Sequence, residues 1–105
     1  MYLPESNTVI EVKTILSDKR EGRFPSSTSV RVKKQLSQIL ELLDKGYQVC
    51  YLFIVLNPTT KQVKLGDELK QIFEECIAKG MICKAYALKF FNESPVIHKC
   101  VKIII

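Results

Sequence analysis

The first part of the chain alternates apolar and polar residues in a way that favours strands. Thr8 to Leu16 is dominated by β-branched residues and follows Asn7, a residue that favours turns. This run predicts a strand over its whole length. Met1 to Leu3 predicts the stub of a preceding strand, with a turn region over Pro4 to Asn7.

Two later stretches have the spacing of helices. Ser17 to Ser27 combines charges with Gly22 and Pro25, which predicts a loop, and residues 26–29 offer side chains that can cap a helix. Apolar residues then recur at helical spacing until Gly46: Val32, Leu36, Ile39, Leu40 and Leu43. A second helix fits Asp67 to Lys79, with these residues facing inward: Leu69, Ile72, Phe73, Cys76 and Ile77.

The remaining apolar runs complete an α/β pattern. Tyr47 to Leu56 is nearly continuous and predicts a central strand covered on both faces. Met81 to Phe91 and Val96 to Ile105 predict further strands. The order of elements predicts a mixed central sheet with two helices on its faces, in one domain over residues 1–105.

Composition narrows the class of protein. The chain of 105 residues is 47% apolar and 26% charged, as expected of one globular domain. No apolar run reaches the roughly 18 residues that a membrane span needs, and we expect a cytoplasmic protein. Cys50, Cys76, Cys83 and Cys100 have no CxxC spacing, so we interpret them as reduced core residues rather than a zinc site or disulfide frame.

The positive charge is concentrated in one segment. Residues 13–34 contain seven basic and two acidic residues, a difference that equals the whole net charge of +5. Concentrated positive charge favours a polyanion through counterion release. A solvated charged loop and helix face explains the same pattern equally well. On either interpretation, no base-reading motif accompanies these charges.

One local motif carries candidate chemistry. Glu11 and Lys13 flank Val12 in the first long predicted strand, and alternation places their side chains on the same face. In a metal-dependent phosphodiesterase, such a carboxylate helps to hold a divalent cation, and the lysine offsets developing negative charge. An ordinary ion pair on a strand gives the same spacing.

Several short runs occur in a distinctive order: Val9–Leu16, Gly22–Pro25, Arg31 and Lys34 before Leu36, Glu41-Leu42 with Gly46, and Leu52–Val55. In this order the sequence resembles the sugar fermentation stimulation protein A family, and the resemblance extends more loosely through Gly80–Ala85. It covers roughly residues 9 to 90.

The resemblance implies the C-terminal, restriction-endonuclease-like domain of that family, which is part of the PD-(D/E)xK nuclease-like superfamily. Glu11 would then be a catalytic residue and a ligand of Mg²⁺ or Mn²⁺, and Lys13 the catalytic lysine. Arg23, Arg31 and Lys34 would contact the phosphates of a nucleic acid without sequence preference. The N-terminal, OB-like domain that the family associates with DNA binding has no counterpart in this sequence.

Two departures from the family pattern bear on catalysis. The family places an aspartate on the strand before Glu-x-Lys, whereas Glu5 is the sole acid before Glu11. A two-residue hairpin at Ser6-Asn7 would leave Glu5 about 10 Å from Glu11 and place Tyr2 opposite Glu11. The family also tends to close the central strand with a glutamine-like residue, where this chain has Leu56.

We therefore expect a DNA-associated nuclease-like domain that is weak or inactive as a metal-dependent phosphodiesterase. The alternative is a catalytically silent remnant that acts as an interaction module and self-associates through exposed sheet edges. We assign His98 a structural or surface role. We expect these aromatic residues to lie mostly in the core: Tyr47, Tyr51, Phe53, Phe73, Phe90 and Phe91.

Overall fold

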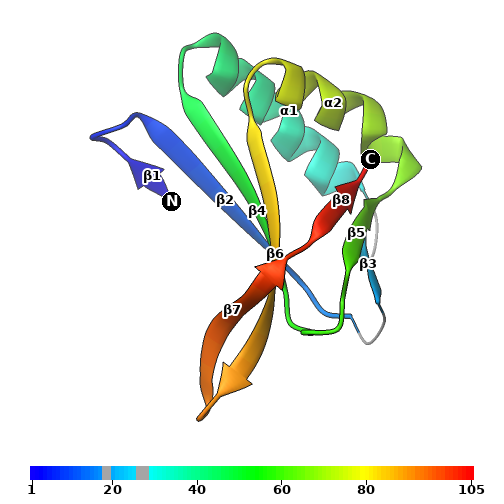
Figure 1. Ribbon diagram of the computed structural model, residues 1–105. Helices are drawn as coiled ribbons and strands as arrows, with labels where there is room; N and C mark the ends of the chain where they lie inside the picture. Colours follow the sequence, from blue (N-terminus) through cyan, green and yellow to red (C-terminus); the bar gives the residue numbers. More distant parts are fainter. Residues whose placement is uncertain (18–19, 26–28) are drawn as a thin grey trace.

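A computed structural model describes residues 1–17, 20–25 and 29–105, and its elements form two sheets and one layer of helices (Figure 1). The elements are β1 (Tyr2–Leu3), β2 (Thr8–Ile15), β3 (Glu21–Phe24), α1 (Val30–Asp44), β4 (Gln48–Val55), β5 (Gln62–Leu65), η1 (Asp67–Leu69), α2 (Lys70–Ala78), β6 (Ile82–Phe91), β7 (Ser94–Cys100) and β8 (Lys102–Ile104). Among the described residues, no helix is long and apolar enough to cross a membrane.

The larger sheet has five strands in the order β1-β2-β4-β6-β7. Its centre is parallel: β2 pairs with β4, and β4 pairs with β6, whereas β1 and β7 are antiparallel to their neighbours. The expected mixed central sheet with two helices is therefore confirmed. Side chains of β4 alternate between buried and half-buried, so one face of this sheet forms the core.

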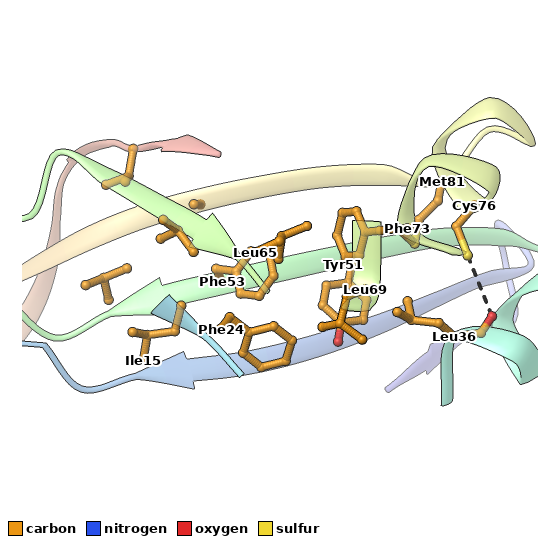
Figure 2. Packing of buried hydrophobic residues seen from close by; sticks show 14 of the residues in the cluster. Ile15, Phe24, Leu36, Tyr51, Phe53, Leu65, Leu69, Phe73, Cys76 and Met81 are labelled. Carbon is orange, nitrogen blue, oxygen red and sulfur yellow. Dashed lines mark hydrogen bonds between the residues drawn. The ribbon is translucent and has the colours of Figure 1, made fainter. Parts of the chain in front are cut away.

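The core lies between that face and both helices. Figure 2 shows Tyr51 and Phe53 of β4 packed among Phe24, Leu69 and Phe73. The rings of Tyr51 and Phe73 meet edge to face, with centroids 5.5 Å apart, which is a favourable aromatic geometry. The thiol of Cys76 on α2 also donates a weak hydrogen bond to the Leu36 carbonyl oxygen on α1, at 3.6 Å.

Both predicted helices are present, with two corrections. The first helix buries Leu36 and Ile39 as expected, but the Ser29 side chain makes no capping hydrogen bond at its N-terminus. The other expected caps, residues 26–28, lie outside the described residues. The second helix begins as the 3-10 turn η1. Ile77, expected to face inward, is 38% exposed because it lies on the outer side of α2.

A small parallel sheet, β3-β5-β8, was not expected from the sequence. β3 lies within the predicted loop Ser17–Ser27, and β5 lies between two predicted elements. Gly22 lets β3 pack closely on β2, because a Cβ atom built there would lie 3.2 Å from Cγ2 of Ile15. The small sheet therefore closes the core at the end of β2.

The carboxyl-terminal part also differs from expectation. Val96 to Ile105 was predicted as one strand, yet the chain forms β7 on the large sheet and β8 on the small one, separated by Val101. The β6–β7 hairpin extends away from the helices (Figure 1). Phe90 and Phe91 were expected in the core but are 64% and 65% exposed, because they lie on this extension.

No element of the described residues covers the second face of the large sheet. Both helices and the small sheet lie on the same side of β2, β4 and β6 (Figure 1). The expectation that the Tyr47–Leu56 strand is covered on both faces was therefore wrong. Cys50, Leu52 and Ile54 are only half-buried, and none of them belongs to the core.

Candidate functional site

Glu11 and Lys13 lie side by side on the core-facing side of β2. Their neighbours on this face, Val9 and Ile15, pack in or against the core, so the pair points toward the helical layer. Lys13 Nζ lies 3.1 Å from Glu11 Oε1, and the two side chains are 25% and 30% exposed. The predicted same-face arrangement of the pair is therefore present.

Gln35 on α1 is a site residue that sequence reasoning missed. Its side-chain amide donates a hydrogen bond to Glu11. Gln35 falls three residues after Val32 and four before Ile39, so it interrupts the apolar stripe of the predicted helix. A polar residue inside that stripe is the signal that could have identified it.

The surroundings of Glu11 favour its ionised form. Burial alone raises the pKa of Glu11, but the hydrogen bonds from Lys13 and Gln35 and the charges of Lys13 and the amino terminus outweigh it. The net effect lowers the pKa of Glu11 below its ordinary value. The carboxylate is consequently negative at neutral pH.

Two buried polar atoms near this carboxylate have no hydrogen-bond partner among the described residues: Gln35 Oε1 and the Tyr51 hydroxyl. Tyr51 is the register partner of Glu11 across β2 and β4. Burial, and then the negative charge of Glu11, raises the pKa of Tyr51. Buried polar groups normally find partners, so these two atoms mark a place where a ligand atom or water would gain hydrogen bonds or coordination.

The pair stands beside a groove of about 920 Å³ whose charged lining residues are all basic. The lining contains Lys13, Arg23, Arg31 and Lys34, together with Gln35, and no carboxylate of the described residues belongs to it. Arg23 comes from β3, and Arg31 and Lys34 come from α1. The three basic residues singled out in the sequence are thus brought to one surface. Lys19, of the same basic segment, lies outside the described residues.

The N-terminal hairpin differs from the predicted one. Tyr2 pairs with Val9 and Leu3 pairs with Thr8, so the turn comprises Pro4 to Asn7 rather than Ser6-Asn7 alone. Tyr2 therefore does not face Glu11. The backbone of Met1 pairs with Ile10 through a hydrogen bond in each direction. Glu5 lies exposed in the turn, which agrees with the expectation that it is a poor ligand beside Glu11.

The end of the central strand has a structural function. Leu56 donates its backbone N–H to the Ile15 carbonyl oxygen. Asn57 Nδ2 donates to the Ser17 carbonyl oxygen at 2.7 Å, and Asn57 Oδ1 accepts from the backbone N–H and hydroxyl of Thr59. Asn57 thus holds the loop after β2 against the loop after β4. An amide side chain reaches Glu11 from α1 instead.

The cysteines do not form a reactive or metal-binding cluster. All four are free thiols, as expected, and no group of three or more His, Cys, Asp or Glu gathers among the described residues. Burial raises the pKa of Cys76 to about 11 and that of Cys83 to about 12, so both stay protonated at neutral pH. Only Cys76 is fully buried, and Cys100 is exposed, so the expectation of core cysteines holds for part of the set.

Known proteins are similar to most of this chain. The chain is 26% identical over 103 residues to a sugar fermentation stimulation protein homolog of Shewanella piezotolerans, covering 93% of this chain and 43% of that protein. The homolog of Clostridium acetobutylicum is 29% identical, with 91% and 44% covered. The homolog of Pelagibacter ubique is 30% identical, with 98% and 48% covered. The chain therefore spans less than half the length of these relatives.

A solved structure shares the fold. The structure of Pyrococcus furiosus SfsA in complex with Ca²⁺ superposes with a TM-score of 0.78 at 18% identity, covering 93% of this chain and 45% of that one. The sequence pattern that defines the sugar fermentation stimulation protein RE domain matches residues 2–94. The chain therefore belongs to the sugar fermentation stimulation protein family, within the part of its members called the RE domain.

Proposed function

We propose that this chain is a DNA-associated nuclease-like domain that binds the phosphate backbone without sequence preference and is weak or inactive as a metal-dependent phosphodiesterase. One observation carries the proposal. A groove that the described residues line with four cations and no carboxylate adjoins the Glu11–Lys13 pair. Such a basic lining attracts phosphates, and a carboxylate with a lysine is the type of pair that acts on a phosphodiester.

The residues present fit a weakly held Mg²⁺ or Mn²⁺. Glu11 supplies one ionised carboxylate, and the unpartnered Gln35 Oε1 is a second oxygen donor beside it. Mg²⁺ commonly keeps several waters and takes one or two carboxylates from the protein. The Ca²⁺ named for the Pyrococcus structure is likewise a cation that prefers oxygen ligands, which supports this assignment.

Each residue has a distinct proposed role. Glu11 would hold the cation with Gln35, and the cation would polarise the phosphate and lower the pKa of a bound water. Lys13 would offset negative charge that develops on the phosphate. Arg23, Arg31 and Lys34 would bind flanking phosphates, which positions the backbone but conveys no sequence information. Only one carboxylate takes part, so the proposed activity is low.

The proposal is tested by the salt dependence of nucleic-acid binding. Replacing Arg23, Arg31 and Lys34 together by alanine is expected to reduce the slope of log affinity against log salt by about three for a duplex, since about one counterion is released per neutralised phosphate. The measurement is a fluorescence anisotropy titration of a short labelled duplex at several salt concentrations. Changing the sequence of the duplex at constant length should leave the affinity nearly unchanged.

A matched control removes the same charge elsewhere. Lys45, Lys70 and Lys89 are exposed and do not line the groove. Their joint replacement by alanine lowers the net charge equally, and the slope should change much less than in the groove variant. If the slope of log affinity against log salt were equal in the two triple variants, the groove would be an ordinary solvated surface and not a nucleic-acid site.

A second candidate function has its own support. A catalytically silent interaction module needs an exposed contact surface, and the uncovered face of the large sheet provides one. Finding no nucleic-acid binding at low salt would favour this candidate. For either function we propose a cytoplasmic location, because the four cysteines are free thiols.

A further inference from the structure

The uncovered face of the large sheet is mostly apolar. Parallel register aligns Ile10 with Cys50 and Ile82 in one row, and Val12 with Leu52 and Lys84 in the next. Val12 and Ile82 are 49% and 54% exposed. None of these six residues belongs to the core or to the side chains packed against it.

The same face continues onto the β6–β7 hairpin. Leu88 pairs with Ile97, and Phe90 pairs with Pro95. Alternation along β6 places Leu88 and Phe90 on the same face as Ile82 and Lys84. Ile97 is 66% exposed. The apolar surface therefore runs from β2 across β4 and β6 to the hairpin, without a covering element among the described residues.

Such a surface is unusual for a parallel sheet. Parallel strands are almost always covered on both faces, because the alternation that leaves one face polar is typical of antiparallel sheets. β2 and β4 have eight residues each. The three strands β2, β4 and β6, taken at about eight residues each, about 4.8 Å spacing and about 3.3 Å per residue, present roughly 380 Å². That area is about half of the about 800 Å² that each partner buries in a standard interface, as expected of a weak association.

The charge on this face restricts its partner. Lys84 is the charged side chain in the two rows above, and it stands on the part of β6 that has no β7 partner. From that edge its long side chain can reach solvent while its stem lies along the apolar surface. A flat aliphatic face with a cation at its edge fits another flat aliphatic face, and a second copy of this face brings no unpaired buried charge.

We propose that two copies of this chain associate face to face through β2, β4 and β6, related by a two-fold axis. Sheets pack in this way about 10 Å apart with their strands within about 30° of each other. In an isologous contact of this kind both copies use the same surface, so that a contact of residue i with residue j is matched by a contact of j with i. The inference does not rest on nucleic-acid binding, because the groove is lined from β2, β3 and α1 rather than from the uncovered face of β4 and β6; it deepens the second candidate function, the interaction module.

Sedimentation equilibrium of the 105-residue chain tests the proposal. The wild type should approach twice the chain mass of 12.0 kDa with rising concentration. Ile82→Lys and Val12→Lys should each weaken association by at least about ten-fold, because each places a charge on the apolar contact face, where the partner copy would bury it. Ile77→Lys is the matched control, since Ile77 is exposed on α2, and it should associate as the wild type does.

Thiol labelling of the wild type gives a second measurement that depends on no variant. Cys50 lies half-buried on the proposed contact face, so its maleimide labelling, followed by peptide mass spectrometry, should slow as concentration rises. A monomeric wild type with concentration-independent labelling of Cys50 would overturn the proposal. Equal dissociation by Ile77→Lys and Ile82→Lys would overturn it as well, because the contact would then not be specific to this face.

Discussion

Gln35 on α1 reaches Glu11 on β2, so a side-chain hydrogen bond joins the helical layer to the sheet beside a mainly apolar core. The contact leaves the other end of the amide, Oε1, buried without a hydrogen-bond partner among the described residues. The amide nitrogen of Gln35 therefore orients the Glu11 carboxylate, and the amide oxygen is available to a ligand beside that carboxylate. The role of Gln35 can therefore be tested by measuring how its replacement changes the pKa of Glu11.

Gln35→Ala is expected to raise the pKa of Glu11, because one of the hydrogen bonds that lowers it is lost. The measurement is an NMR titration of the Glu11 side-chain carboxyl carbon. Gln38→Ala is the matched control, since Gln38 lines the same groove from the same helix. An unchanged Glu11 titration in Gln35→Ala, or an equal change in both variants, would contradict the assigned hydrogen bond.

The chain is expected not to cleave DNA or RNA appreciably with Mg²⁺ or Mn²⁺. A single carboxylate with one amide oxygen holds these cations weakly, and metal-assisted hydrolysis depends on fixing the ion against phosphate and water. Plasmid and single-stranded substrates are incubated across a metal titration with the wild type and with Glu11→Gln. Cleavage by the wild type that disappears in Glu11→Gln would prove the site complete.

Glu11 is expected to stabilise the folded protein at neutral pH, and this contribution should disappear in acid. Its pKa is lower in the folded protein, so the contribution is present above the ordinary value of about 4.3 and is lost as pH falls through the folded value. Urea unfolding should thus separate wild type and Glu11→Gln at pH 7 and bring them together in strong acid. Glu5→Gln, in the exposed turn, should stay within about 0.5 kcal/mol of the wild type. A difference in the free energy of unfolding between wild type and Glu11→Gln that stays the same at every pH would contradict the lowered pKa.

Tyr51→Phe is expected to leave the protein as stable as before or to stabilise it by about 1 kcal/mol, because the hydroxyl is buried without a partner. The ring keeps its contacts with Phe53 and Phe73. Tyr51→Ala should instead cost about 3–5 kcal/mol through the lost ring. Chemical denaturation measures both values. A loss above about 1 kcal/mol for Tyr51→Phe would indicate that the hydroxyl is bonded in solution.

Local patterns predicted the elements that carry most of the core. Thr8–Leu16 and Tyr47–Leu56 became β2 and β4, and both helices formed where apolar residues recur at helical spacing. The short strands β3 and β5 were missed, because four residues carry little periodic signal and charges surround them. Pairing between strands distant in sequence, rather than local preference, makes these segments extended.

The candidate site was predictable only in part. Strand alternation placed Glu11 beside Lys13, but the approach of Arg23 to Arg31 and Lys34 depends on the unforeseen strand β3. The exposure of Phe90 and Phe91 was missed for a related reason. A run of strand-forming residues specifies a strand, but whether another layer covers that strand depends on the rest of the fold.

The transfer of the chain from one sheet to the other at Val101 has a consequence for biosynthesis. β8 lies beside β5, which lies beside β3, the strand that carries Arg23. A ribosome releases β8 after every other strand described here, so the small sheet reaches its full width only once Lys102–Ile104 has emerged. The pairing of β2 with β4 and the formation of α1 need no such delay. The small sheet, to which the Arg23 strand β3 belongs, is therefore completed last during translation, after the strand that bears Glu11 and Lys13 has emerged.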